Sequence, residues 1–194
     1  MNPGRRMLLL LAALFLAPLA ISFFMYYGHA GLQPTKRVNR GDLFQPARPL
    51  PPLSLILADG SGTPADFLRH HWTILYTSGG DCDERCRTAL HDSRQVRLAL
   101  DRDMVRVQRV FVARGACCDL EFLQREHPDL LVVRADDGAA RTAAAALLPM
   151  LDAAPGSLYV IDPLSNLILH YAPDAPPKGL LEDLKRLLKL SQIG

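Results

Sequence analysis

The chain has 194 residues, enough for one ordinary domain and one additional segment. Its formal net charge is only +2, and its arginines are scattered along the sequence, so we expect no nucleic-acid partner. Four cysteines are too few for a scaffold held together by disulfides, and a domain of this size does not need one, so function is the better explanation of the first pair.

The first predicted element is an N-terminal transmembrane helix. Residues 7–27 are almost entirely apolar, and at about 1.5 Å per residue a helix of this length spans roughly 30 Å, the hydrocarbon thickness of a bilayer. Arg5 and Arg6 precede the apolar run. We therefore expect a single-pass anchor in a bacterial inner membrane, with the rest of the chain in the periplasm. A signal peptide cleaved after Ala30 is the alternative.

The composition divides the chain into three regions. The anchor occupies residues 1–27. Residues 28–52 include five prolines and scattered charges, which favours an extended, poorly packed linker. Residues 53–194 carry the alternating apolar patterns of a folded domain.

The apolar periodicity of the domain predicts an α/β fold. The predicted elements are strands at 53–57 and 72–76, a helix at 82–101, a strand at 105–113, a helix at 119–126, a strand at 130–133, a helix at 136–148, strands at 157–162 and 167–171, and a helix at 177–190. Two strand–helix–strand units imply a parallel sheet core, and the last two strands an antiparallel hairpin at its edge. With a cysteine pair directly after a strand, we predict a thioredoxin-like mixed sheet flanked by helices.

Cys82 and Cys86 are the candidate functional residues. Gly79 and Gly80 allow a tight turn after the preceding strand, which places the cysteines at the start of the next helix. There, positions i and i+4 lie on one face, and the helix dipole favours thiolates. Three interpretations remain open: a disulfide–dithiol couple, a Cu(I) site made of two soft thiolates, or a structural pair.

The adjacent pair Cys117 and Cys118 lies between a predicted strand and a short helix. Vicinal disulfides are uncommon, so we expect two half-buried thiols that pack against the start of the helix. A supporting redox or metal-binding role is the alternative.

Four features carry a resemblance to a known family: the N-terminal anchor with its linker, the Cys-x-x-x-Cys pair flanked by Thr77 and Leu90, an aliphatic strand ending in Asp162 and Pro163, and a C-terminal amphipathic helix. With these features the sequence resembles the Sco/SenC family, membrane-anchored thioredoxin-like proteins that assemble the copper site of cytochrome c oxidase. The resemblance implies thiol–disulfide exchange or copper delivery through Cys82 and Cys86, and a protein partner in respiratory oxidase assembly.

The sequence also departs from the Sco/SenC pattern. Asp83 stands where the family usually has proline, and no histidine occurs at residues 153–157, where the family has its third copper ligand. Pro155 lies where thioredoxin-like folds often have a cis-proline, so we predict a cis bond there. The candidates for a replacement copper ligand are His70, His71, His91, His127, Met150 and His170.

For thiol exchange, Cys82 is predicted to be the attacking thiolate and Cys86 the resolving cysteine. A function from a different class is the alternative: a non-catalytic interaction module with a thioredoxin-like fold, tethered to the membrane.

Overall fold

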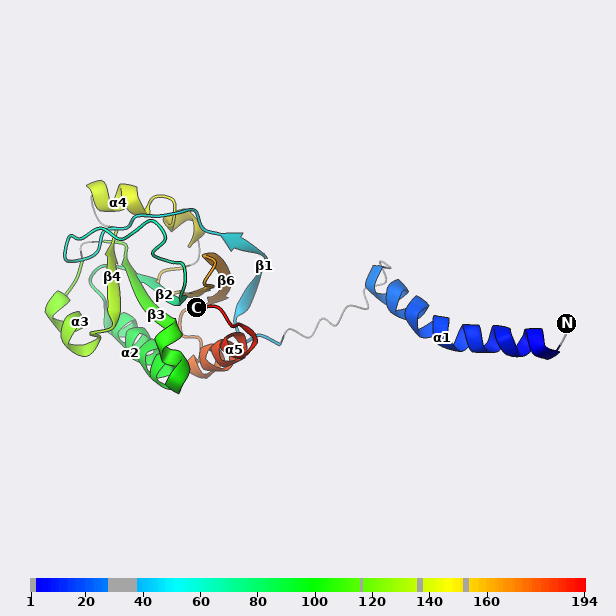
Figure 1. Cartoon of the computed structure of the whole chain (residues 1–194). Helices are drawn as coiled ribbons and strands as arrows, with labels where there is room; N and C mark the ends of the chain where they lie inside the picture. The colour runs from blue at the N-terminus through cyan, green and yellow to red at the C-terminus, as the bar shows by residue number, and fades with distance from the viewer. Residues whose placement is uncertain (1–2, 28–37, 116, 136–137, 152–153) are drawn as a thin grey trace. The chain divides into compact units, whose positions relative to one another are not determined.

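The computed structural model describes residues 3–27, 38–115, 117–135, 138–151 and 154–194 (Figure 1). The chain forms two units, Met1–Val38 and Asn39–Gly194.

The first unit contains helix α1, Pro3–Tyr27. Its mean hydropathy reaches 2.6, and none of its residues is buried within the protein. At about 1.5 Å per residue its 25 residues extend roughly 37 Å, which exceeds the hydrocarbon core of a bilayer. By length and composition α1 is therefore a candidate membrane-spanning helix, as the sequence predicted.

The second unit is built on one mixed sheet. Its described strands have the order β1-β6-β5-β2-β3-β4. Their bounds are Asp42–Pro49 for β1, Trp72–Ser78 for β2, Val107–Ala113 for β3, Leu130–Arg134 for β4, Leu158–Ile161 for β5 and Asn166–Tyr171 for β6. Strands β2, β3 and β4 are parallel, and the pairings β1–β6, β6–β5 and β5–β2 are antiparallel. The predicted parallel core with an antiparallel hairpin is confirmed.

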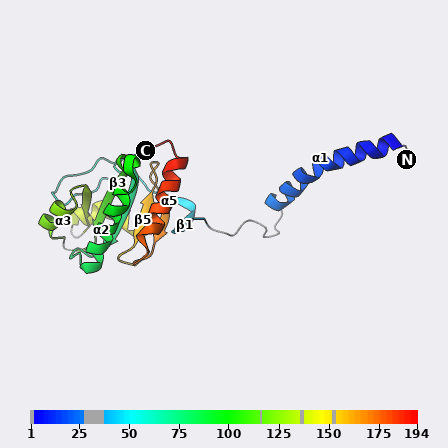
Figure 2. The same cartoon turned by 90° about the horizontal axis from the view of Figure 1, so that it is seen from below.

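Helices cover both faces of this sheet (Figures 1 and 2). One face is covered by α2, Glu84–Leu98, α3, Leu120–Glu126, and α5, Pro177–Leu190; the other by α4, Gly138–Ala144, and residues 50–68. Short 3-10 helices span Asp101–Arg106 (η1) and Leu148–Met150 (η2). The arrangement is the predicted thioredoxin-like sheet between layers of helices.

The sheet is buried on both faces because its central strands are apolar throughout. In β2, Leu75 packs into the core cluster beneath α4, whereas Ile74 and Tyr76 point to the α2 side. This period-two alternation assigns each residue to one of two cores.

Two stretches near the start of the domain differ from the sequence prediction. Strand β1 lies within the residues expected to form the linker and pairs with β6. Its prolines are tolerated because an edge strand leaves some backbone N–H positions unpaired. The expected strand at 53–57 is wrong: after two prolines and before a turn it is too short to add a strand. Leu57 instead forms an isolated bridge with Val133 of β4, and through this bridge the segment around Leu57 covers the outer edge of that strand.

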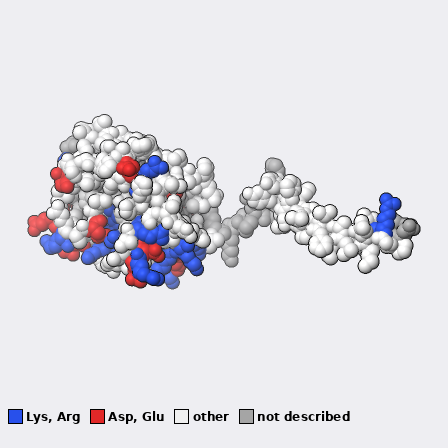
Figure 3. All heavy atoms as spheres, in the orientation of Figure 1, with Lys and Arg blue, Asp and Glu red and all other residues white. Residues whose placement is uncertain are grey.

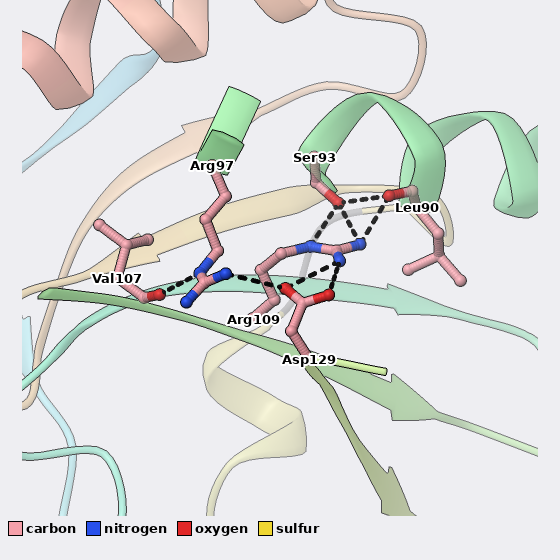
Figure 4. Close-up of polar contacts among 6 residues, drawn as sticks. All are labelled: Leu90, Ser93, Arg97, Val107, Arg109 and Asp129. Atoms are coloured by element: carbon pink, nitrogen blue, oxygen red, sulfur yellow. Dashed lines mark hydrogen bonds and ion pairs between the residues drawn. The ribbon is translucent and has the colours of Figure 1, made fainter. Parts of the chain in front are cut away.

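A buried arginine with a partly buried counter-ion holds α2 on the sheet (Figure 4). The side chain of Arg109 in β3 is 1% exposed and pairs with Asp129 at 3.1 Å. Its guanidinium also donates hydrogen bonds to the Leu90 carbonyl oxygen at 2.6 Å and to the Ser93 hydroxyl at 3.0 Å, both on α2. Asp129 is shared with Arg97, which lies 3.4 Å away. The network joins the middle and last turns of α2 to β3 and to the start of β4.

Charges of both signs lie together over the side of the domain that carries α2, α3 and α5 (Figure 3). The side formed by α4 and residues 50–68 shows few charged side chains in this view. The visible face therefore has no extended patch of one sign.

Substituting Asp129 with Asn keeps the shape of the side chain but removes the charge opposite Arg109. We expect the free energy of unfolding to fall by about 3 kcal/mol, because a buried guanidinium loses its counter-ion. Urea unfolding followed by circular dichroism measures the loss.

Asp103→Asn is the matched control. Asp103 pairs with Arg106 at 3.2 Å but is 51% exposed, so this change should cost less than about 1 kcal/mol. Equal losses in the two variants would contradict the role assigned to the Arg109 network.

Candidate functional site

The loop that carries the first cysteine pair leaves the C-terminal end of β2. Cys82 has a φ of 40° and lies two residues before the first residue of α2, and Asp83 between them is the N-cap. The Asp83 carboxylate accepts a hydrogen bond from the backbone N–H of Cys86 at 3.0 Å. Helix α2 therefore begins two residues later than predicted, because an aspartate at this position satisfies a free N–H of the first turn. Cys86 stays in that first turn.

Cys82 and Cys86 form a disulfide, with their Cα atoms 5.0 Å apart. Both residues are buried: 5% of Cys82 and none of Cys86 is exposed. They belong to an apolar cluster that also contains Tyr76, Leu90 and Phe111. The structure therefore brings together the two residues that the sequence singled out, at the start of a helix, while their roles in exchange or copper binding stay predictions.

A pocket of about 450 Å³ lies beside the loop. Tyr76 and Ser78 from β2 and Asp83 and Glu84 from the start of α2 line one side of it. The remainder of its lining comes from α2, from Pro155 and Gly156, and from the segment between β6 and α5. Burial raises the pKa of the Tyr76 hydroxyl, so this group is neutral and able to donate a hydrogen bond at physiological pH.

The cis bond predicted at Pro155 is not found. Within the described residues the cis peptide bonds are Gln45–Pro46 and Cys117–Cys118. Pro155 does line the pocket, but the chain reverses direction through Gly156, whose φ is +94°. The N–H of Gly156 donates to the Thr77 carbonyl oxygen at 2.8 Å, which fixes this turn against β2. A glycine adopts the positive φ without steric cost, so the turn does not need a cis-proline.

Cys117 and Cys118 also form a disulfide, with Cα atoms 3.3 Å apart. The expectation of two separate thiols is therefore wrong. Both residues are half-buried and pack against the same apolar cluster as Cys82 and Cys86. This proximity was not predicted, although the sequence contains a signal for it. Each pair follows one of two predicted parallel strands, and the C-terminal ends of parallel strands meet at one edge of a sheet.

The candidate replacement ligands are dispersed. His70, His71 and His91 are exposed, and His91 contacts Asp92 on α2. His170 lies 3.3 Å from the Ser157 hydroxyl, and Met150 packs against the core on the α4 side. Within the part of the chain that the structure describes, no three His, Cys, Asp or Glu residues form a group able to hold a metal ion.

His127 is the one buried histidine among the described residues, at 4% exposure. Its ring stacks edge-on against Phe122, with centroids 6.2 Å apart, and its Nδ1 has no hydrogen-bond partner among the described residues. Burial, reinforced by the positive charge of Arg109, lowers the pKa of His127. We interpret it as a neutral core residue.

The lowered pKa predicts a pH dependence of stability. The unfolded chain binds a proton at His127 more readily than the folded protein does. The contribution of His127 to the free energy of unfolding is therefore fully present above the unfolded pKa of about 6.5 and is lost as the pH falls below it. We expect the wild-type protein to lose more stability between about pH 7.5 and 5.5 than His127→Gln, with a difference in slope below about 1.4 kcal/mol per pH unit. Chemical unfolding across this range measures it. Parallel curves for the wild-type protein and His127→Gln would show that His127 does not titrate differently in the folded and unfolded chains.

Comparisons with known proteins support this geometry. Residues 72–191 match the family model described as a transmembrane-like, thioredoxin-like, C-terminal domain. No curated protein matches the sequence.

Several solved structures share the fold. The apo Sco1 protein from Thermus thermophilus superposes with a TM-score of 0.63 at 18% identity, over 79% of this chain and 99% of that one. Copper-bound ScoI from Arabidopsis thaliana has a TM-score of 0.59 at 18% identity, over 78% and 99%. BsSco is described with a disulfide switch as a member of the Sco family of cytochrome c oxidase assembly proteins. It superposes with a TM-score of 0.56 at 13% identity, over 75% of this chain and 96% of that one. The predicted likeness to Sco/SenC proteins is thus confirmed in the fold.

Proposed function

The chain belongs to the family of transmembrane-like, thioredoxin-like C-terminal domains, and from this premise we propose that it is a membrane-anchored thiol–disulfide exchange protein of the Sco type. The observation that carries the proposal is the Cys82–Cys86 disulfide at the start of α2. Asp83 and Glu84, which follow Cys82 in the chain, line a pocket of about 450 Å³, although the two cysteines themselves do not. In a disulfide-exchange protein the two sulfurs must be close enough to close a ring after each cycle, and this pair meets the requirement.

The two cysteines would have different roles. Cys82 lies outside α2 and is 5% exposed, whereas Cys86 lies in the first helical turn and is fully buried. Cys82 is therefore the residue whose sulfur attacks a partner disulfide and forms the mixed disulfide. The thiolate of Cys86 then attacks the Cys82 sulfur, releases the reduced partner and closes the Cys82–Cys86 disulfide. Two electrons pass to the partner.

The partner is proposed to be a protein of respiratory oxidase assembly. The likeness to BsSco, a member of a family of cytochrome c oxidase assembly proteins, supports this assignment. Helix α1 would hold the domain at the inner membrane of a bacterium, and the oxidising periplasm would suit a protein that cycles through a disulfide.

Copper delivery through the same residues is the second candidate. The copper-bound state of Arabidopsis ScoI favours it, and two thiolates are soft donors suited to Cu(I). Copper would be cargo, held by reduced Cys82 and Cys86. Among the described residues the candidate histidines and Met150 form no group with the two cysteines that could hold a metal, so a further donor would come from the partner.

The exchange mechanism is tested with single cysteine variants of the full chain in detergent micelles. The probe is a fluorescent peptide with one internal disulfide. We expect the reduced wild-type protein to reduce the peptide, and Cys86→Ser to trap it on Cys82 as a mixed disulfide that mass spectrometry identifies. Cys82→Ser should neither reduce nor trap the peptide. Loss of reduction in Cys86→Ser without a trapped adduct on Cys82 would overturn the assigned roles.

Two further measurements separate the alternatives. Stoichiometric Cu(I) binding by the reduced protein, lost in both single variants, would support copper delivery. If cells that carry Cys82→Ser/Cys86→Ser still assemble active oxidase at the wild-type level, the protein is a non-catalytic interaction module instead.

A further inference from the structure

The second cysteine pair has no role in the exchange mechanism proposed for Cys82 and Cys86, but its position beside them indicates one. We propose that Cys117 and Cys118 are an internal exchange partner of Cys82 and Cys86, and that they carry reducing equivalents between the protein surface and the buried pair. The inference rests on the proposed function in one respect, namely that Cys82 and Cys86 cycle between disulfide and dithiol.

The sheet register places the two pairs at equivalent positions. Strands β2 and β3 are parallel neighbours, and their last residues, Ser78 and Ala113, are register partners. Cys82 comes four residues after Ser78, and Cys117 comes four residues after Ala113. Adjacent strands lie about 4.8 Å apart, so the two loops leave the same edge of the sheet side by side, with the first cysteine of each at the same distance along the chain from its strand. Each loop then enters a helix through an aspartate N-cap.

Contacts along both loops hold them together. The backbone N–H of Arg114 donates to the Ser78 carbonyl oxygen at 3.0 Å. Farther along, a Cβ on Gly115 would lie 3.4 Å from the backbone nitrogen of Gly80, so the two backbones nearly touch. Loops in such contact bring their cysteines into one neighbourhood.

The helices that follow the two loops are also joined. The guanidinium of Arg87, the residue after Cys86, lies 4.6 Å from the centre of the Phe122 ring on α3. Cys117 and Cys118 pack against the apolar cluster that contains Cys82 and Cys86. The two disulfides therefore contact one apolar cluster, and the helices that follow them, α2 and α3, are themselves in contact.

Burial gives the two pairs different access to solvent. Cys82 and Cys86 are 5% and 0% exposed, whereas Cys117 and Cys118 are half-buried. Thiol–disulfide exchange needs the attacking sulfur to reach the disulfide, so an external dithiol reaches the Cys117–Cys118 disulfide more easily. The half-buried pair is thus placed to act as the entry point for electrons.

This transfer of electrons from Cys117 and Cys118 to Cys82 and Cys86, here called the relay, consists of three exchange steps. An external protein dithiol first reduces the Cys117–Cys118 disulfide and is itself oxidised to a disulfide. The Cys117 thiolate then attacks the Cys82 sulfur, forms a Cys82–Cys117 disulfide and expels the Cys86 thiolate, which takes up a proton. Finally the Cys118 thiolate attacks the Cys117 sulfur, restores the Cys117–Cys118 disulfide and releases Cys82. Two electrons have moved from the external dithiol to Cys82 and Cys86.

The mixed disulfide is the first test. The full chain with Cys86→Ser and Cys118→Ser retains Cys82 and Cys117, and we expect mild oxidation at low protein concentration to join them within one molecule. The matched control, Cys82→Ser with Cys118→Ser, retains the fully buried Cys86 and should join it to Cys117 more slowly. Peptide mass spectrometry identifies each link. Absence of the Cys82–Cys117 link, or equal rates in the two variants, would overturn the relay.

The rate of reduction is the second test. Dithiothreitol is added to the oxidised full chain, the reaction is stopped with acid, and the thiols of Cys82 and Cys86 are counted by alkylation. We expect dithiothreitol to reduce the Cys82–Cys86 disulfide of the Cys117→Ser/Cys118→Ser variant about tenfold more slowly than that of the wild-type protein. In guanidinium chloride, where burial is lost, the two proteins should react at equal rates. Equal rates in the folded proteins would overturn the proposal, and unchanged unfolding curves exclude a folding defect.

Neither test uses a partner protein or copper. If these two tests reject the internal exchange, the proposed reduction of a partner by Cys82 and Cys86 is not affected. Conversely, failure of the peptide assay with a detectable Cys82–Cys117 link would reject the proposed function and retain the internal exchange.

Discussion

The parallel, in-register pairing of β2 with β3 is the constraint on which the functional architecture depends. It brings the ends of the two strands to one edge of the sheet, and each strand is followed there by a cysteine loop. The hydrogen bonds of the strands fix this alignment, so the two loops cannot shift independently. Two cysteine pairs separated by thirty or more residues in the chain are neighbours for this reason.

The buried Arg109 network maintains the other half of the geometry. A charge inside an apolar sheet is tolerated only when it is paired and hydrogen-bonded, and here Asp129, Ser93 and the Leu90 carbonyl meet that need. Because two of these partners lie on α2, the requirement also fixes the helix that carries Cys86. The Cys82–Cys86 pair is thus positioned by the Arg109 network, which holds α2 on the sheet, and by the Asp83 cap at the start of this helix.

The chain differs in two ways from the Sco/SenC and thioredoxin-like patterns that the sequence led us to expect. The position expected to hold a histidine ligand has none, and the turn at Pro155 and Gly156 is made by a glycine with positive φ. In exchange, the chain has a second pair of sulfurs beside the first. The second pair of sulfurs supports the proposal of thiol–disulfide exchange at this site.

The sequence by itself determined the apolar N-terminal helix, the order of most strands and helices, the thioredoxin-like class and the place of Cys82 and Cys86 at the start of a helix. These follow from local periodicity and from a glycine turn before a helix, which need no knowledge of distant contacts. Only the tertiary structure decided that β1 joins the sheet, that residues 53–57 cover an edge instead of forming a strand, and that Arg109 is buried. It alone also paired Cys117 with Cys118 next to the first disulfide. Each of these depends on which strands become neighbours, and strand order is set by long-range packing that a local pattern does not encode.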